Sequence, residues 1–292
     1  MGLNYSSFYV AALFFYFSDA LQKTTSSGAI TWKYLFIRSC YTAAIALLFN
    51  TILFGLNNIP SINIIFLLAC CSVCCGLGLF FYIKSINTLK FSNVGSLTIV
   101  GNVIQQLIGI FLLGEKYNKY NFIAYALMSF GCVYQLINNK TLKGAKYVLL
   151  STVFWTVGYI MLSRVLQKST IYWSVPIMEI TIMIMGYLCM KFYSIANTKA
   201  AIDKQAITIR PIFFILIALL NYFGSLLNNH SFKNIPISTI SFLQLSLMPL
   251  FYIVSLKIFK EKPNKVELIS FITGFAGFAL FIINNLKFAS SS

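Results

Sequence analysis

The sequence predicts an all-α membrane protein with ten transmembrane helices, arranged as two inverted five-helix repeats. Three observations predict this fold class. The 292 residues are 59% hydrophobic and only 10% charged, whereas about a quarter of the residues in a soluble domain are charged. The apolar residues form long runs that lack the alternation of a membrane β-barrel. A pattern in the middle of the chain also recurs near its end, 146 positions later.

Ten stretches are long and apolar enough to cross a membrane, which needs about 20 mostly apolar residues. The first has no basic residue before it and contains Asp19, so we interpret it as a retained span and not as a cleaved signal peptide. Short polar segments separate most of the others. The predicted spans are residues 5–22, 32–53, 62–83, 92–114, 120–138, 145–166, 171–193, 211–230, 236–259 and 265–286.

The recurring pattern is a Glu-Lys turn between two apolar runs. Glu115 precedes the fifth span and Glu261 precedes the tenth, and the offset of 146 that relates them also superposes Gly131 on Gly277. The acidic side chains are expected to lie near the N-termini of those two spans, where a helix favours negative charge. The turn therefore identifies the fold, and we do not expect it to bind substrate.

Two sequence halves follow from this repeat, residues 1–140 and residues 141–292. Because five spans is an odd number, the second half must enter the membrane from the opposite side, as in many secondary transporters. The charge pattern agrees with a membrane protein. A net charge of +16 would suggest nucleic acid in a soluble protein, but these lysines separate apolar runs, where they set topology and contact lipid headgroups. No nucleic-acid partner is predicted.

The chain resembles the drug/metabolite transporter superfamily, in its ten-helix EamA-type branch. The resemblance is carried by Gly114-Glu115-Lys116, its copy at Lys260-Glu261-Lys262, Arg38, Tyr82-x-x-Ser85 and Pro249. It implies a mid-membrane cavity lined by spans one, three, four, six, eight and nine, with the chain termini in the cytoplasm. The Lys and Arg count points the other way, because fifteen of the 22 fall in the loops after odd-numbered spans, on the side opposite to the termini, and the positive-inside rule would then place both termini outside. Span four has Asn102-Val103 where the family commonly has a proline, so a kink there is not expected.

Polar residues within a span are costly and mark candidate binding sites. Several occur at helical spacing, so that four spans each present one mixed polar and aromatic face. The alternative is that these residues form hydrogen bonds that only hold the bundle together. The candidates for substrate binding are Asp19, Arg38, Tyr82, Thr98, Asn102, Gln105, Trp155, Tyr159, Glu179, Asn221, Ser225, Asn228 and Gln244.

Four of the titratable residues carry sharper hypotheses. Asp19 either binds a cation or proton, or lies at the membrane interface beside Lys23. Arg38 and Glu179 each follow a tryptophan by six residues, Trp32 and Trp173, at an offset of 141 between the two halves. We therefore consider a buried charge pair, against the alternative that each caps a helix or snorkels. His230 is the candidate for proton coupling, although a histidine at a helix end is also explained by the last helix carbonyls.

No cofactor or metal is predicted. The run Cys70-Cys71-Ser72-Val73-Cys74-Cys75 lacks a second ligand cluster, and cysteine here serves as a small apolar residue between helices. The sequence contains no phosphate-binding loop, zinc-protease helix or nucleophile elbow. These observations indicate a protein that is not an enzyme.

The predicted function is secondary-active transport of a small polar, amino-acid-like metabolite by alternating access through a central cavity. Protons or a counter-substrate would supply the energy. The alternatives are a passive channel or facilitator, an exporter of drugs or of nucleotide-sugar-like anions, and a membrane scaffold or sensor that transports nothing. We expect a monomer or weak homodimer in contact with membrane lipid, in the inner (cell) membrane of a bacterium.

Overall fold

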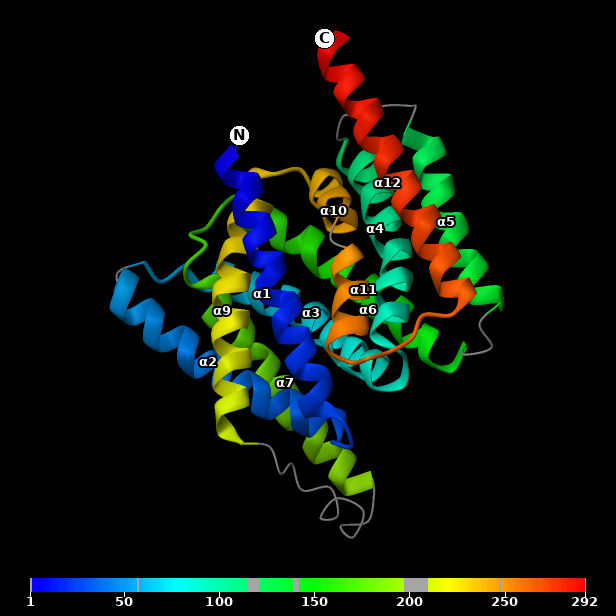
Figure 1. Cartoon of the computed structure of the whole chain (residues 1–292). Coiled ribbons are helices and arrows are strands. Elements are labelled where there is room, and N and C mark those ends of the chain that lie inside the picture. Colours follow the sequence, from blue (N-terminus) through cyan, green and yellow to red (C-terminus); the bar gives the residue numbers. More distant parts are fainter. Residues whose placement is uncertain are drawn as a thin grey trace. The chain divides into compact units, whose positions relative to one another are not determined.

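The protein was analysed as a computed structural model that describes residues 2–56, 58–114, 121–138, 142–196, 210–246 and 248–291. The described residues form α-helices and no strands (Figure 1). The predicted all-α class is therefore confirmed. The helices are α1 (Gly2–Ser26), α2 (Thr31–Phe54), α3 (Ile62–Thr88), α4 (Phe91–Leu113), α5 (Asn121–Asn138), α6 (Leu142–Leu166), α7 (Ser174–Ala196), α9 (Pro211–Asn234), α10 (Ile237–Ser246), α11 (Met248–Lys257) and α12 (Lys265–Ser291).

Nine of the ten predicted spans each overlap one helix. The exception is span nine, residues 236–259, which overlaps both α10 and α11. Pro249 is the second residue of α11, a position where the missing N–H of proline costs little. Helix α4 continues through Asn102, as expected in the absence of a proline. The total of ten transmembrane helices stays a prediction.

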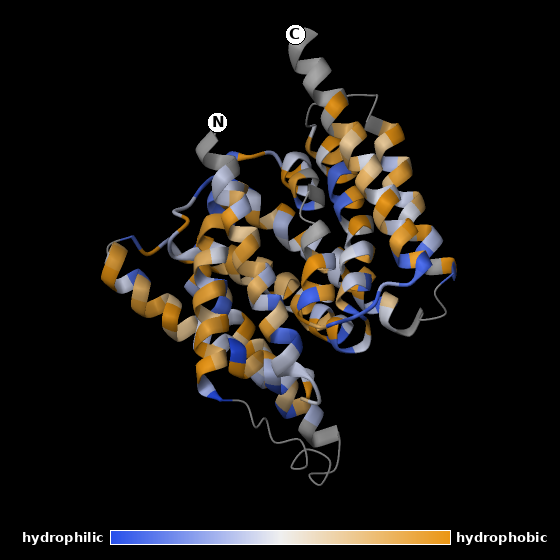
Figure 2. Cartoon of the chain, viewed as in Figure 1, coloured by the Kyte–Doolittle hydropathy of each residue, from blue (hydrophilic) through white to orange (hydrophobic). Residues whose placement is uncertain are grey.

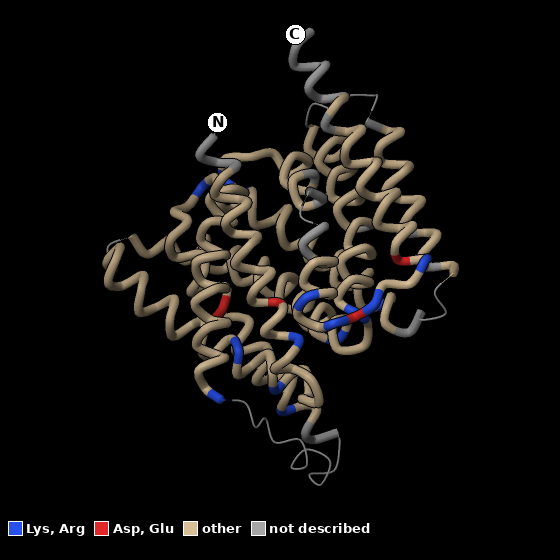
Figure 3. The backbone as a smooth tube through the Cα atoms, viewed as in Figure 1, with Lys and Arg blue, Asp and Glu red and all other residues tan. Residues whose placement is uncertain are grey.

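Six helices in the described part of the chain are long and apolar enough to cross a membrane, namely α2, α3, α4, α6, α7 and α9. Large apolar side chains are exposed on the helices, with Ile62, Leu112 and Ile137 each 75% exposed. Figure 2 shows apolar residues along most of each helix, and Figure 3 shows Lys and Arg mainly at helix ends and connections. Such surfaces fit lipid as the surrounding solvent.

The chain divides into two compact units. Unit 1 comprises Met1–Asn87 and Val157–Asn234, and unit 2 comprises Thr88–Thr156 and Ile235–Ser292. Each unit contains helices from both sequence halves, and α6 contributes to both units. The units are thus not the two predicted repeats, whose boundary near residue 140 concerns internal sequence similarity and stays a prediction.

Unit 1 is held together by packing of α1 on α9 and of α2 on α7 and α9. Its core includes Ala46, Val175 and Tyr222. Asn50 reinforces this packing, because its amide donates to the Tyr172 carbonyl at 2.7 Å and its Oδ1 accepts from the Tyr222 hydroxyl at 2.9 Å. One buried polar residue therefore joins α2, α9 and the turn that precedes α7, with both halves of its amide satisfied.

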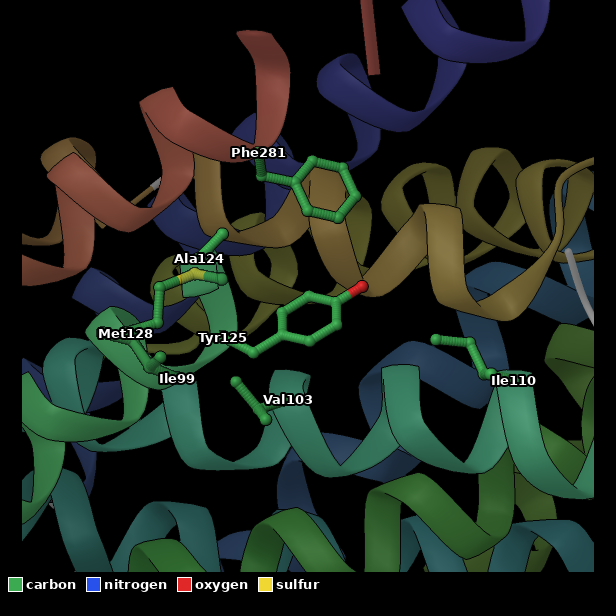
Figure 4. Close-up of a cluster of buried hydrophobic side chains, with 7 residues drawn as sticks. All are labelled: Ile99, Val103, Ile110, Ala124, Tyr125, Met128 and Phe281. Atoms are coloured by element: carbon green, nitrogen blue, oxygen red, sulfur yellow. The ribbon is translucent and has the colours of Figure 1, made fainter. Parts of the chain in front are cut away.

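Unit 2 is organised around α4, which packs on α5, α10, α11 and α12, while α5 packs on α12. Its apolar core is shown in Figure 4 and consists of Ile99, Val103, Ile110, Ala124, Tyr125, Met128 and Phe281. Two glycines allow α5 and α12 to approach closely. A Cβ at Gly131 would lie 2.8 Å from the Ser270 carbonyl oxygen, and one at Gly277 would lie 2.7 Å from that of Ala124. The two contacts are related by the same offset of 146.

The ends of the unit 2 helices follow local rules. Helix α4 ends at Gly114, whose φ of 69° is the left-handed conformation typical of a helix C-terminus. Helix α12 begins with a capping box, in which the Glu267 N–H donates to Asn264 Oδ1 at 2.8 Å and the Asn264 N–H donates to Glu267 Oε2 at 3.0 Å.

The expectation for Glu261 was wrong. Its carboxylate accepts hydrogen bonds from the Phe91 N–H at 2.8 Å and from the Ser255 hydroxyl. The negative charge therefore lies at the start of α4, and the acidic residue of the first turn of α12 is Glu267. The equivalent expectation for Glu115 falls outside the described residues.

Candidate functional site

Asp19 lies within α1 and is held by two neutral donors. Its Oδ2 accepts from the Tyr82 hydroxyl of α3 at 2.8 Å, and its Oδ1 accepts from Gln22 Nε2 at 3.2 Å. The residue is partly exposed, whereas Tyr82 is only 2% exposed. The structure thus joins Asp19 and Tyr82, two of the predicted site residues. The two hydrogen bonds to Asp19 from neutral groups fix the orientation of its carboxylate.

A second branch leads from Gln22 to α9. Gln22 Nε2 also donates to Ser18 Oγ at 3.1 Å, and the Ser18 hydroxyl donates to Asn221 Oδ1 at 3.0 Å. These side chains are almost fully buried, with exposures of 1% for Gln22, 0% for Ser18 and 2% for Asn221. We call Asp19, Ser18, Gln22, Tyr82 and Asn221 the Asp19 network.

The network leaves two buried polar atoms without a partner, Gln22 Oε1 and Asn221 Nδ2. An unpartnered buried polar atom costs about 1–3 kcal/mol. Unpartnered buried polar atoms in folded proteins are often explained by a bound ligand, ion or water molecule. The network is therefore more polar than is needed to join α1, α3 and α9.

Arg38 and Glu179 form the buried charge pair that their positions in the sequence suggested. Arg38 Nη1 lies 3.0 Å from Oε1 and 2.9 Å from Oε2 of Glu179, and both residues are 5% exposed. The pair joins α2 to α7, which excludes separate snorkelling to the membrane surface. Whether the pair opens during a transport cycle is a separate hypothesis that the contact does not test.

Neither of the ion pairs within the described residues, Arg38–Glu179 and Lys90–Glu267, includes Asp19. Its carboxylate bonds to Tyr82 and Gln22, and the predicted alternative, an interfacial Asp19 beside Lys23, stays a prediction.

Other predicted residues of unit 1 lie apart from this network. Asn228 is 8% exposed and Ser225 is half-buried, and neither forms a hydrogen bond with the Asp19 network. The Tyr159 ring packs against Phe232 in a tilted arrangement, with 4.8 Å between the ring centroids. The backbone carbonyl of His230 accepts from Asn234 Nδ2, one turn before α9 ends, and the role of the imidazole stays a prediction.

The remaining candidates belong to unit 2 and form a separate set. Thr98 and Asn102 are half-buried on α4, and the Thr98 hydroxyl donates to the Gly95 carbonyl of its own helix. Gln105 is 3% exposed, with its Nε2 unpartnered. Trp155 of α6 and Gln244 of α10 are half-buried. These residues remain candidates, and no hydrogen bond in the described chain joins them to one another.

Sequence reasoning did not select Ser18 and Gln22, two polar neighbours of Asp19 in the first span, as site residues. It missed Gln106 altogether. Gln106 is 0% exposed and both of its amide atoms are unpartnered. It lies on the same face of α4 as Ile99, Val103 and Ile110, at helical spacing, so the apolar pattern concealed it.

The cysteines behave as predicted for apolar residues. Cys71 and Cys75 are buried in α3, and a Cβ at Gly158 of α6 would lie 2.6 Å from Cys75 Sγ. Close approach of the two helices thus depends on small side chains. Within the described residues, no group of three or more His, Cys, Asp or Glu is placed to hold a metal ion.

Taken together, the apolar helices and the buried polar network define a multi-pass helical membrane protein. Residues 142–283 match the sequence model of a family described as "EamA-like transporter family". The chain matches none of the curated proteins. A solved structure described only as "Crystal structure of protein" has a TM-score of 0.68 and 12% identity, with 96% of each chain covered. At that identity the similarity shows the fold alone.

Proposed function

We propose that this chain is a secondary-active transporter that moves a small polar metabolite across the membrane by alternating access. One observation carries the proposal. The segment that matches the transporter family supplies Asn221 to the Asp19 network and Glu179 to the buried ion pair. The polar groups inside unit 1 are thus built partly from the very residues that resemble a transporter.

The cost of these groups supports a binding role. A bundle that served only as a scaffold would be as stable, or more stable, with apolar residues in place of buried charges. Charged residues inside spans are accordingly rare and usually mark transport pathways. Asp19 fits this description best, because it belongs to no ion pair within the described residues and part of its side chain is accessible.

The packing of the helices supports an inverted repeat. Helices at equivalent places in the two sequence halves pair directly, namely α2 with α7, α4 with α10 and α5 with α12. The glycine contacts between α5 and α12 are reciprocal under the offset of 146. Two inverted repeats are a common basis of alternating access, in which one site faces each side of the membrane in turn.

The side chains favour a polar substrate. The candidates offer carboxylate, hydroxyl, amide and phenol groups, which suit an amino acid or a related compound better than a flat apolar drug. Asp19 disfavours anions at the network itself. We propose the bacterial inner membrane as its location, with lipid as the surrounding partner and a monomer or weak homodimer as the working form.

Counterflow in liposomes tests this proposal. Purified protein would first be screened for thermal stabilisation by a metabolite library, and each hit would then be tested for counterflow. We expect saturable counterflow, reduced at least tenfold in Asp19→Asn and unchanged in Thr24→Val, an exposed position on the same helix. Flux without saturation or counterflow would indicate a channel. Neither stabilisation nor flux would indicate a scaffold or sensor.

A further inference from the structure

We propose that the Asp19 network is a binding site for a monovalent cation, either a proton or Na⁺, which neutralises Asp19. This inference rests on the proposed transport function for its role, because the cation would couple transport to an ion gradient. The binding itself does not depend on that role. It follows from the charges around Asp19 and from the arrangement of oxygen atoms beside it.

Neither of the ion pairs within the described residues includes Asp19. On α2 and α7, Arg38 and Glu179 pair with each other, and the positive charge of Arg38 still acts on Asp19 over a longer distance. On α1 itself, Lys23 follows Asp19 by four residues. The remaining titratable neighbours are phenols that are neutral near pH 7, namely Tyr16 of α1, Tyr82 of α3 and Tyr159 of α6. Helix α9 contributes Asn221, which carries no charge.

The position of the Gln22 amide indicates where a cation would sit. Its Nε2 lies 3.2 Å from Asp19 Oδ1 and 3.1 Å from Ser18 Oγ, so the positive end of the amide dipole is placed between two oxygen atoms. Its Oε1 is buried and has no partner. A rotation of the amide would exchange the two atoms, and the cation would then have Oε1 as a third oxygen ligand.

These groups have the chemistry that hard cations prefer. Carboxylate, hydroxyl and amide oxygens bind such ions, whereas the site offers no thiolate or imidazole. The network also links α1, α3 and α9 through Tyr82 and Asn221. Neutralising Asp19 would change the hydrogen bonds between these helices, and this gives the cation a direct effect on how they pack.

Thermal denaturation of the full-length protein in detergent tests the site without any transport assay. The Tm would be measured in NaCl and in choline chloride of equal ionic strength, at several pH values from 5.5 to 8.5. If the ion is Na⁺, we expect a saturable rise of roughly 5 °C that is absent in Asp19→Asn and present in Thr24→Val. If the ion is the proton, wild type should gain stability relative to Asp19→Asn as the pH falls, with no effect of Na⁺.

Gln22→Leu separates the two ions and keeps the carboxylate. It removes the unpartnered Oε1, so we expect at least a tenfold loss of Na⁺ affinity, whereas the pH response should persist. The proposal is overturned if wild type and Asp19→Asn respond identically to both Na⁺ and pH. Counterflow that survives such a result would leave the transport function standing. Cation binding without counterflow would instead overturn the transport function and leave the site.

Discussion

The two units use their acidic residues in opposite ways. In unit 1, Asp19 and Glu179 lie inside helices and bond to side chains of other helices. In unit 2, Glu261 and Glu267 lie at or before helix starts and accept from backbone N–H groups. A carboxylate at a helix N-terminus is stabilised by the helix itself. A carboxylate within a span is not, so unit 1 is where function is to be sought.

The uncharged polar residues sharpen this comparison. In unit 1 the unpartnered amide atoms belong to a connected network that ends on a charge. In unit 2, Gln106 has no hydrogen-bond partner in the described chain, and the residues that share its helix face are apolar. A ligand needs several polar groups that act together. Because Gln106 is not joined to other polar groups by hydrogen bonds in the described chain, we interpret it as a residue that costs stability and not as part of a binding site.

The largest expected effect comes from breaking the buried ion pair. Glu179→Gln leaves the Arg38 charge buried without a counter-charge, which should lower the free energy of unfolding by about 3–5 kcal/mol. Thermal denaturation in detergent measures this. The double variant Arg38→Met, Glu179→Leu should recover most of the loss. Separate losses that simply add in the double variant would show that the two residues do not act as a pair.

The glycines allow a matched test of packing in the two units. A Cβ at Gly277 of unit 2 meets the Ala124 carbonyl oxygen of the backbone at 2.7 Å, whereas one at Gly76 of unit 1 meets the flexible end of Met185 at 2.5 Å. Gly277→Ala should therefore destabilise by about 1–3 kcal/mol, and Gly76→Ala by less than about 1 kcal/mol. Equal losses of thermal stability would contradict this difference between the units.

Gln106 provides a prediction of opposite sign. Replacing it with Leu removes two unpartnered buried polar atoms from an apolar face and should stabilise the protein by about 1–2 kcal/mol. Gln106→Glu is the matched control, which should destabilise because it adds a buried charge. A rise in Tm for Leu and a fall for Glu are expected. If Leu lowers the Tm, Gln106 has a partner and unit 2 contains a polar site of its own.

Much of the fold follows from composition, because long apolar runs without alternation leave helices as the only spanning structure. The pairing of Arg38 with Glu179 could also be predicted from the sequence, since each of them follows a tryptophan by six residues in its own half. The contact between Asp19 and Tyr82 could not, because it depends on how α1 and α3 pack. Glu261 was misplaced for a related reason. A local rule assigns it to the next helix, whereas packing brings it to the start of α4.

The smallest effect tests the architectural role assigned to the unit 2 carboxylates. Asn264→Ala removes the side chain that accepts from the Glu267 N–H, so the free energy of unfolding should fall by about 1 kcal/mol. Asn264→Ser keeps a capping oxygen and should change it by only a few tenths of a kcal/mol. Both variants should retain the substrate affinity and the cation response of wild type. A changed cation response in Asn264→Ala would mean that the helix starts of unit 2 take part in binding, and the division of roles between the units would fail.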